Sequence, residues 1–339
     1  MGDWNWLARG RFSHESGRSP GQEMLRLTVS VLVPCFNAGR WLIECIESVK
    51  KQSFPTLEII IVDDGSDETE TLEILGGYKD SSSVSVLRKA NGGVSSARNA
   101  ALDVAKGDYV LFLDADDYLE PNALEALVAA AEKTGAVFVG GGWRDVDEAG
   151  RPLRSIAPKA HSADYFSAVV AIGNAVGSVL QKCRAGLKFN DTMPWEALEY
   201  FLDCLSNGEK AVFINDVVVN KRQSLRPDRL TIKLDHFEPL RMGTFFVGRK
   251  KKLLALGTAS DERFAALDKR ILACIHGLLY ANRYADGAIL AKSVNRDLLG
   301  QVATCRFGSF AWFFKWGGVR AAYAFVAINR VIDMLSRGD

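Results

Sequence analysis

Two groups of carboxylates each follow a run of apolar residues, and their types and spacing suit the binding of a cation and a phosphate. The first group follows the run IIIV, the second follows YVLFL, and together they are Asp63, Asp64, Asp114, Asp116 and Asp117. Crowded carboxylates repel one another unless a cation or donor groups compensate them. Hard oxygen ligands suit Mg²⁺ or Mn²⁺, which usually also hold substrate phosphates. The two groups therefore indicate a metal-assisted site for a phosphate-bearing nucleotide.

Buried strands must end just before these carboxylates to bring them together. Apolar runs predict strands at residues 27–34, 57–62, 83–87, 109–113 and 137–140. Helical spacing and helix-start signals predict helices at residues 39–51, 68–78, 93–105 and 121–133. This alternation predicts a parallel, doubly wound sheet, in which ligands bind outside the carboxyl ends of the strands.

Several nucleotide-binding and hydrolase signatures are missing from the sequence. The segment after the first predicted strand is VPCFNAG, which lacks the G-x-G-x-x-G pattern of dinucleotide-binding enzymes. The chain also contains no G-x-x-x-x-G-K-[ST] and no G-x-S-x-G. These absences argue against a dehydrogenase and a P-loop enzyme, and a nucleotidyltransferase would need a glycine-rich basic loop at the same place.

Composition favours an ordinary cytoplasmic globular protein. The net charge of +1 creates no global field for nucleic acid, so we expect no nucleic-acid partner. The six cysteines form no C-x-x-C pair, which argues against zinc and favours reduced thiols. Residues 1–22 contain no apolar core of a signal peptide, and we expect residues 1–25 to be a disordered tail.

The later part of the chain has a looser pattern. The segment Trp195–Leu205 predicts a helix, residues 211–219 predict a strand, and residues 236–300 predict further helices. We therefore expect one domain over residues 26–230, made of halves 26–145 and 146–230, followed by a helical region over residues 231–339.

Three local sequences resemble the nucleotide-sugar-binding domain of family 2 glycosyltransferases over roughly residues 27–145: VSVLVPCFNAGRWLIECIESVKKQSF, LEIIIVDDGSDE and NGGVSSARNAALDVAKGDYVLFLDADDYLEP. The resemblance implies an α/β fold of the GT-A type, with a Rossmann-like, mostly parallel sheet and a helical C-terminal extension. It also implies inverting transfer of a sugar from a nucleotide diphosphate, with a UDP-sugar favoured. The acceptor would be a glycan or lipid-linked hydroxyl in cell-surface polysaccharide or glycolipid synthesis.

The resemblance assigns nucleotide-binding roles near the first two strands. Pro34 and Phe36 match a turn that lines the base pocket, where Phe36 would stack on the base or else serve as a core aromatic. Asn37 fits a ligand contact or a helix N-cap. Asp64 matches the carboxylate that accepts hydrogen bonds from the base, whereas Asp63 is expected to be structural.

The resemblance also assigns roles near the diphosphate. Arg98 would approach the base and diphosphate, or else form a surface salt bridge with Asp103 or a neighbouring acid. Asp114 would bind the ribose hydroxyls, and Asp116 would bind Mg²⁺ or Mn²⁺. Asp117 either contributes to the metal site or caps the following loop.

The acceptor side departs from the family pattern. Family members carry a Glu-Asp pair at the start of a helix, and here Glu196 matches the Glu while Ala197 replaces the usual catalytic base. Glu196 is the expected substitute base, and Asp191 and Glu199 are the further candidates. The alternative is that the negative charge of Glu196 only stabilises the N-terminus of the helix. The missing Asp also leaves open a non-catalytic nucleotide-sugar-binding protein of the same fold.

A second departure lies in the loop VVVNKRQSLRPDRLT. Arg222 matches a family arginine and would contact the diphosphate, and Lys221 and Arg226 are the alternative residues of this loop for that contact. The histidine that often accompanies this arginine is missing.

Aromatic and basic residues gather in the C-terminal third. Segment 307–335 has five aromatic residues within 310–316 but also Lys315 and Arg320, which favours an interfacial helix over a spanning one. The run GRKKKLL at residues 248–254 could reach anionic headgroups. One expectation is therefore a location at the inner face of the membrane. The alternative is that segment 307–335 is a buried or oligomer-forming helix and that the run at residues 248–254 is a solvated group of charges.

Overall fold

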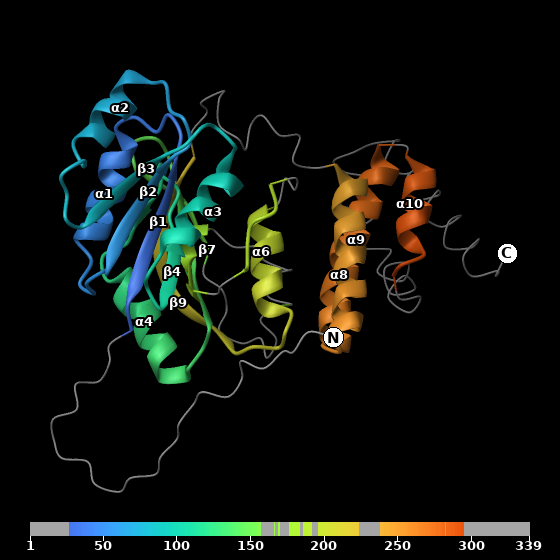
Figure 1. The fold of residues 1–339 in the computed structure, drawn as a ribbon. Coiled ribbons are helices and arrows are strands. Elements are labelled where there is room, and N and C mark those ends of the chain that lie inside the picture. Colours follow the sequence, from blue (N-terminus) through green and yellow to red (C-terminus); the bar gives the residue numbers. More distant parts are fainter. Residues whose placement is uncertain are drawn as a thin grey trace, which may run out of the picture.

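A mixed β-sheet forms the centre of the structure, a computed structural model that describes residues 27–156, 176–183, 186–191, 196–223, 238–281 and 283–294 with Phe166 and Val169 (Figure 1). Within these residues the sheet has nine strands in the order β3-β2-β1-β4-β8-β6-β9-β5, and β7 pairs with β6. The expected N-terminal tail and segment 307–335 lie outside the described residues.

Strands and helices alternate along the chain from β1 to β4, and the order is less regular after β4. The strands are β1 (Val29–Cys35), β2 (Glu58–Asp63), β3 (Val84–Arg88), β4 (Tyr109–Phe112), β5 (Tyr118–Leu119), β6 (Phe138–Val146), β7 (Pro152–Ile156), β8 (Val179–Lys182) and β9 (Ala211–Arg222). The helices are α1 (Trp41–Lys50), α2 (Thr69–Gly76), α3 (Val94–Val104), α4 (Ala123–Thr134), α6 (Glu196–Leu205), α8 (Pro239–Leu256), α9 (Asp261–Tyr280) and α10 (Tyr284–Ala291).

Strands β1 to β4 form the parallel half of the sheet, as the sequence predicts. Strand β1 pairs in parallel with β2 and β4, and β2 pairs in parallel with β3. All seven residues of β1 are buried, because helices cover both faces of this half. The four helices expected between residues 39 and 133 are confirmed within about two residues at each end.

The other half of the sheet corrects the expectation of a parallel sheet. Strand β8 runs antiparallel to β4 and β6, β5 runs antiparallel to β9, and only the pair β6–β9 is parallel. Strand β6 also continues through Gly140 and Gly141 to Val146 instead of ending at residue 140. A Cβ atom at Gly140 would lie 2.2 Å from the Phe213 ring, so these glycines make room for side chains of β9.

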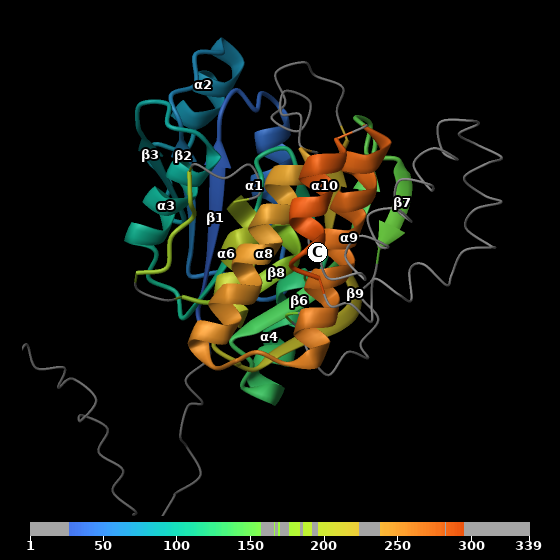
Figure 2. The same ribbon diagram turned by 90° about the vertical axis from the view of Figure 1, so that its right-hand side faces the viewer.

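Two apolar clusters place the helices in layers. Val31 and Val33 of β1 pack with α1 and α4 on one face, and Leu32 packs with α3 and α6 on the other. Helices α8, α9 and α10 join the second cluster on the outer side of α6 (Figure 1). Figure 2 shows these three helices in front of the sheet, with β7 at its edge. No helix in the described parts of the chain is both long enough and apolar enough to cross a membrane.

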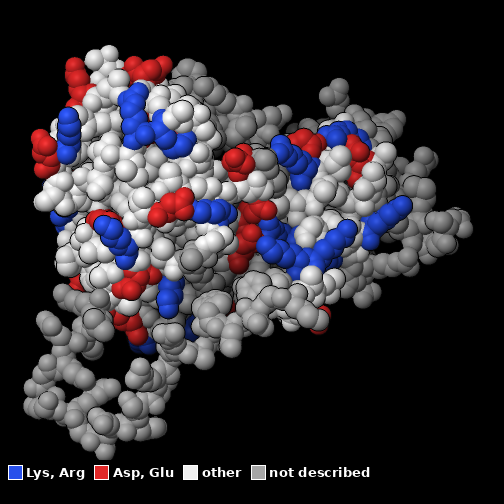
Figure 3. Space-filling view, viewed as in Figure 1, with Lys and Arg blue, Asp and Glu red and all other residues white. Residues whose placement is uncertain are grey.

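Most basic side chains of the run GRKKKLL form ion pairs with carboxylates of neighbouring helices. Arg249 is buried, forms ion pairs with Glu199 and Asp203 of α6, and lies 4.9 Å from the Phe245 ring centroid. Lys250 pairs with a buried carboxylate of α9, and Lys252 also pairs with Asp203. Figure 3 shows basic side chains over α8 and α9 beside acidic side chains over α6. The run is therefore in large part an internal connection between α6, α8 and α9.

Replacing Arg249 with Met should destabilise the fold. Glu199 and Asp203 would keep their charges in a largely buried place without their shared cation, at a cost on the order of 2 kcal/mol. Urea unfolding followed by circular dichroism measures the loss. Lys251→Met is the matched control, because Lys251 is exposed on the same helix. Equal stability of the two variants would contradict this role of Arg249.

Candidate functional site

The expected carboxylates meet at the carboxyl edge of the parallel strands. Asp63 ends β2 opposite Cys35 of β1, and the backbone N–H of Asp64 donates to the Cys35 carbonyl at 2.8 Å. The backbone N–H of Leu113 donates to the Leu32 carbonyl at 2.9 Å, so Asp114 also emerges at this edge. The register of the parallel strands therefore brings both acidic groups to one crevice.

Asp64 is held by a cradle of donors from the segment after β3. Its carboxylate accepts hydrogen bonds from the backbone N–H of Gly92 at 3.0 Å, from that of Gly93 at 2.7 Å and from the Lys89 Nζ at 2.7 Å. Gly93 has φ = +85°, a conformation that favours glycine. A carboxylate has about four lone-pair sites, so these three donors fix Asp64 and leave room for a ligand donor.

Asp63 has a structural role, as expected. Its buried carboxylate accepts from the Ser66 backbone N–H at 2.9 Å and from Arg88 Nη1 at 2.9 Å. Sequence reasoning did not single out Arg88 and Lys89. The available signal was a basic pair at the end of β3, next to the acidic pair that ends β2.

The turn after β1 exposes Phe36 and uses Asn37 internally. Phe36 is 48% exposed, which excludes the core-aromatic alternative, while Pro34 is buried within β1. The Asn37 Oδ1 accepts from the backbone N–H groups of Asp67 at 3.0 Å and Glu68 at 3.1 Å. The side chain of Asn37 therefore caps the entry to α2, and Phe36 is the residue of this turn that presents itself at the surface.

Arg98 faces the second acidic group. It is 3% exposed, and its Nη2 lies 2.9 Å from the Asp114 Oδ1. The alternative partner, Asp103, pairs with Lys188 at the other end of α3. The guanidinium also lies over the Phe189 ring, at 5.3 Å from the ring centroid. Arg98 thus compensates the charge of Asp114 from beneath the crevice.

Asp117 is buried behind Asp116. Its Oδ1 accepts the backbone N–H of Arg222 at 2.8 Å, so Asp117 joins the loop after β4 to the end of β9. Burial raises the pKa of Asp117 well above its ordinary value, and the charges of Asp116 and Asp114 raise it further. Asp116 is partly exposed at the crevice. The described residues contain no cluster of three or more metal-ligating side chains, so a cation here would need other oxygens besides Asp116.

Arg222 lies in the interior instead of lining the crevice. It is 2% exposed, and its guanidinium contacts Glu44 together with the backbone carbonyls of Asp116, Asp147 and Glu148. This arrangement differs from the expected diphosphate contact, because long-range contacts with α1 and with the turn between β6 and β7 occupy the guanidinium. Arg226 and the rest of segment 224–237 lie outside the described residues.

The residues expected on the acceptor side lie on or near α6. Glu196 is the first residue of this helix, its side chain lies outside the described part of the structure, and Ala197 packs against the apolar core. Glu199 pairs with Arg249 and accepts from the Asn190 Nδ2 at 3.1 Å. Glu199 is therefore engaged in packing, which leaves Glu196 and the exposed Asp191 as candidate bases.

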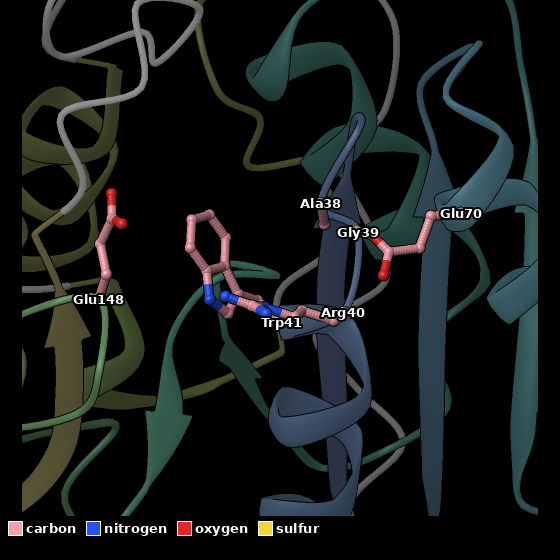
Figure 4. Close-up of a pocket in the computed structure, with 6 residues that line it drawn as sticks. All are labelled: Ala38, Gly39, Arg40, Trp41, Glu70 and Glu148. Carbon is pink, nitrogen blue, oxygen red and sulfur yellow. The ribbon is translucent and has the colours of Figure 1, made fainter.

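A hollow lies beside the crevice, at the start of α1. It has a volume of about 310 Å³ and is lined by Ala38, Gly39, Arg40, Trp41, Glu70 and Glu148 (Figure 4). None of the carboxylates of the crevice lines it.

In sequence, the first half of the chain is similar to known proteins. Residues 30–181 match the family model described as glycosyl transferase family 2. The glycosyltransferase GlyG of Streptococcus pneumoniae is 38% identical over 122 residues, which are 35% of this chain and 40% of that protein. The chondroitin synthase of Pasteurella multocida is 42% identical over 98 residues, 29% of this chain and 10% of that protein. The chain thus spans less than half the length of these relatives.

A solved structure extends the likeness beyond the matched sequence. Residues 1–349 of S. aureus TarS, in complex with UDP-GlcNAc, align with a TM-score of 0.63 over 92% of this chain and 93% of that chain. The sequence identity is 16%, so this likeness shows the fold alone. It confirms the expected α/β fold of the GT-A type with a helical C-terminal region.

The variant Asp117→Asn should become more stable relative to the wild type as the pH rises. The raised pKa of Asp117, caused first by burial, means that the folded state holds this proton more tightly than the unfolded state, whose pKa is about 3.9. The free energy of unfolding of the wild type therefore falls as the pH rises from the unfolded-state pKa of about 3.9 to the raised pKa of Asp117 in the folded state. This loss is absent in Asp117→Asn. Metal-free urea unfolding from about pH 4 to about pH 9 measures the difference.

Asp63→Asn is the control for which we expect the opposite change in stability. It removes the ion-pair partner of Arg88, so it should destabilise the protein at neutral pH. If Asp117→Asn is less stable than the wild type at alkaline pH, the buried charge of Asp117 is not a cost to the fold.

Proposed function

Because residues 30–181 match the model of glycosyl transferase family 2, we propose that the chain transfers a sugar from a nucleotide-diphosphate donor to an acceptor hydroxyl with inversion. One observation carries the proposal. The cradled Asp64, the pair Arg98–Asp114 and the carboxylate of Asp116 all meet at one edge of the sheet, inside the matched region. This edge is where open α/β sheets bind their ligands.

The donor half of the crevice suits a nucleoside. Asp64 can accept an N–H of the base, and the exposed ring of Phe36 offers an aromatic face for stacking. Solved complexes of the structurally similar TarS contain UDP-GlcNAc and UDP, which supports a UDP-sugar as the donor. Asp114, fixed by Arg98, would accept hydrogen bonds from the ribose hydroxyls.

The second acidic group fits a divalent cation. Asp114 and Asp116 concentrate negative charge beside the buried Asp117, whose pKa is raised first by burial and then by the charges of these two carboxylates. Asp116 would hold Mg²⁺ or Mn²⁺ together with diphosphate oxygens and water. Such a cation stabilises the charge that develops on the departing nucleotide diphosphate.

The chain's own residues supply the proton transfer. The acceptor oxygen forms a bond to the anomeric carbon while the bond from that carbon to the diphosphate oxygen breaks. Glu196, at the start of α6, would take the proton of the acceptor hydroxyl. The position of Glu196 in the sequence supports this role, and the engagement of Glu199 with Arg249 removes one competitor.

Two variants separate donor binding from chemistry in one assay. Asp116→Ala should abolish the Mn²⁺-dependent part of donor binding, because it removes the proposed protein ligand of the cation. Glu196→Gln should keep donor binding and lower turnover by roughly 10²–10⁴-fold, because a base is lost while the crevice is intact. Calorimetry with a panel of UDP-sugars, with and without Mn²⁺, gives binding, and the release of UDP gives turnover.

The outcomes also test the non-catalytic alternative. Donor binding by the wild type without any release of UDP from any donor would favour a binding protein of this fold. Full turnover by Asp116→Ala would refute the metal assignment, and full turnover by Glu196→Gln would move the base to another acid.

The acceptor is proposed to be a glycan or a lipid-linked sugar, as in polysaccharide or glycolipid synthesis. The similarity to the chondroitin synthase and hyaluronan synthase of Pasteurella multocida supports glycan synthesis. A lipid-linked acceptor would suit a protein held at the inner face of the membrane by the aromatic, basic segment 307–335.

The full chain should therefore bind anionic liposomes at low salt. Co-sedimentation measures this binding, and the double substitution Trp312→Glu and Trp316→Glu should abolish it, because acidic side chains cannot enter the interface. Lys251→Met is the control for a purely electrostatic contribution from α8. A wild-type chain that stays wholly in the supernatant would refute the membrane contact.

A further inference from the structure

Arg222 is a buried cation that joins three separate parts of the structure. Its Nε donates to the backbone carbonyl of Asp116 at 3.2 Å, in the loop after β4. Its Nη1 donates to the carbonyl of Glu148 at 2.7 Å, in the turn between β6 and β7. Its Nη2 pairs with the carboxylate of Glu44 on α1.

Aromatic rings complete the surroundings of this guanidinium. The rings of Trp41 and Tyr118 each lie with their centroid 5.5 Å from the Arg222 Cζ. Figure 4 shows Trp41 at the first turn of α1, on the side that faces Glu148. A guanidinium suits such a place, because it is planar, weakly hydrated and able to donate in several fixed directions at once.

The contacts of Arg222 reach the proposed metal ligand through the backbone. The Arg222 side chain binds the carbonyl of Asp116, and the Arg222 backbone N–H binds the carboxylate of the next residue, Asp117, at 2.8 Å. Two consecutive residues of the acidic loop are therefore fixed by one residue of β9. Glu44 completes the arrangement by compensating the buried charge of Arg222.

We propose that Arg222 and Glu44 are positioning residues that set the place of the Asp116 carboxylate in the crevice. The inference rests on the proposed function, because it assigns Asp116 to a cation. It replaces a direct contact between Arg222 and the diphosphate with an indirect action through the loop after β4. Glu44, whose side chain is 51% exposed, is a part of this machinery that the sequence did not indicate.

The two possible roles of Arg222 predict opposite effects at Glu44. If Arg222 positions Asp116, Glu44→Ala loosens the loop and weakens Mn²⁺-dependent binding of UDP. If Arg222 contacts the diphosphate directly, Glu44→Ala frees the guanidinium and removes a negative charge, so binding of UDP stays the same or becomes tighter. Glu44 is half-exposed, so its loss should lower the stability of the fold without preventing folding, and circular dichroism checks that the variant is folded.

The experiment measures UDP affinity by calorimetry with and without Mn²⁺ for the wild type, Glu44→Ala, Glu44→Gln and Arg222→Lys. We expect Glu44→Ala to lower the Mn²⁺-dependent affinity at least about fivefold, with a smaller loss for Glu44→Gln, which keeps an acceptor oxygen. Arg222→Lys should lose about tenfold or more, because one ammonium cannot reach all three partners. The metal-free affinity for UDP should change less than about twofold in the Glu44 variants.

Glu47→Ala is the matched control, because it removes the same charge from the same helix at a residue paired only locally with Lys50. It should bind UDP with Mn²⁺ as the wild type does. Wild-type affinity in Glu44→Ala, or tighter binding, would overturn the positioning role even if Arg222→Lys does not fold. If the wild type binds no UDP with or without Mn²⁺, the proposed function fails, and this inference fails with it. If the wild type binds UDP and Glu44→Ala binds it equally well, only this inference fails. The two failures are therefore distinguishable.

Discussion

The repulsion between carboxylates at one edge of a parallel sheet is the constraint on which the rest of the site depends. Parallel strands end at the same edge, so the carboxylates that follow β2 and β4 cannot avoid one another. The structure places a cation beside three of them: Arg88 beside Asp63, Lys89 beside Asp64 and Arg98 beside Asp114. Arg88 and Lys89 come from the end of β3, which follows β2 in the sheet, whereas Arg98 comes from α3, which precedes β4 in the chain, so neighbouring elements of the fold compensate these charges.

These compensations divide the crevice into two independently supported parts. The cradle of Asp64 comes from the segment after β3 and uses backbone N–H groups, which hold the carboxylate rigidly without occupying all of its acceptor capacity. The loop that carries Asp114 to Asp117 is held by α3 on one side and by β9 on the other. The proposed recognition of a base and the proposed binding of a cation therefore depend on separate parts of the surrounding structure.

The sequence predicts the parallel half well because its signals are local. Unbroken apolar runs and helical spacing fix β1 to β4 and the helices between them, and carboxylates at the ends of strands indicate the site. The other half depends on distant contacts: β5 has two residues, and β7 is almost fully exposed, so neither leaves an apolar pattern. The pairing of Arg222 with Glu44 spans 178 residues, and no local pattern could indicate that this arginine lies inside the protein.

Helix α6, on which the proposed acceptor half depends, packs on the sheet and is also supported from outside it. Helix α6, which begins with Glu196, is held on its outer side by Arg249 of α8, whose partners Glu199 and Asp203 lie one and two turns further along α6. The orientation of α6 thus depends on the helical region as well as on the sheet, whereas the acidic crevice takes its orientation from strand register. Changes in α8 can therefore alter the first turn of α6, where we propose that the acceptor meets Glu196, while the strand register that places Asp64, Asp114 and Asp116 is unchanged.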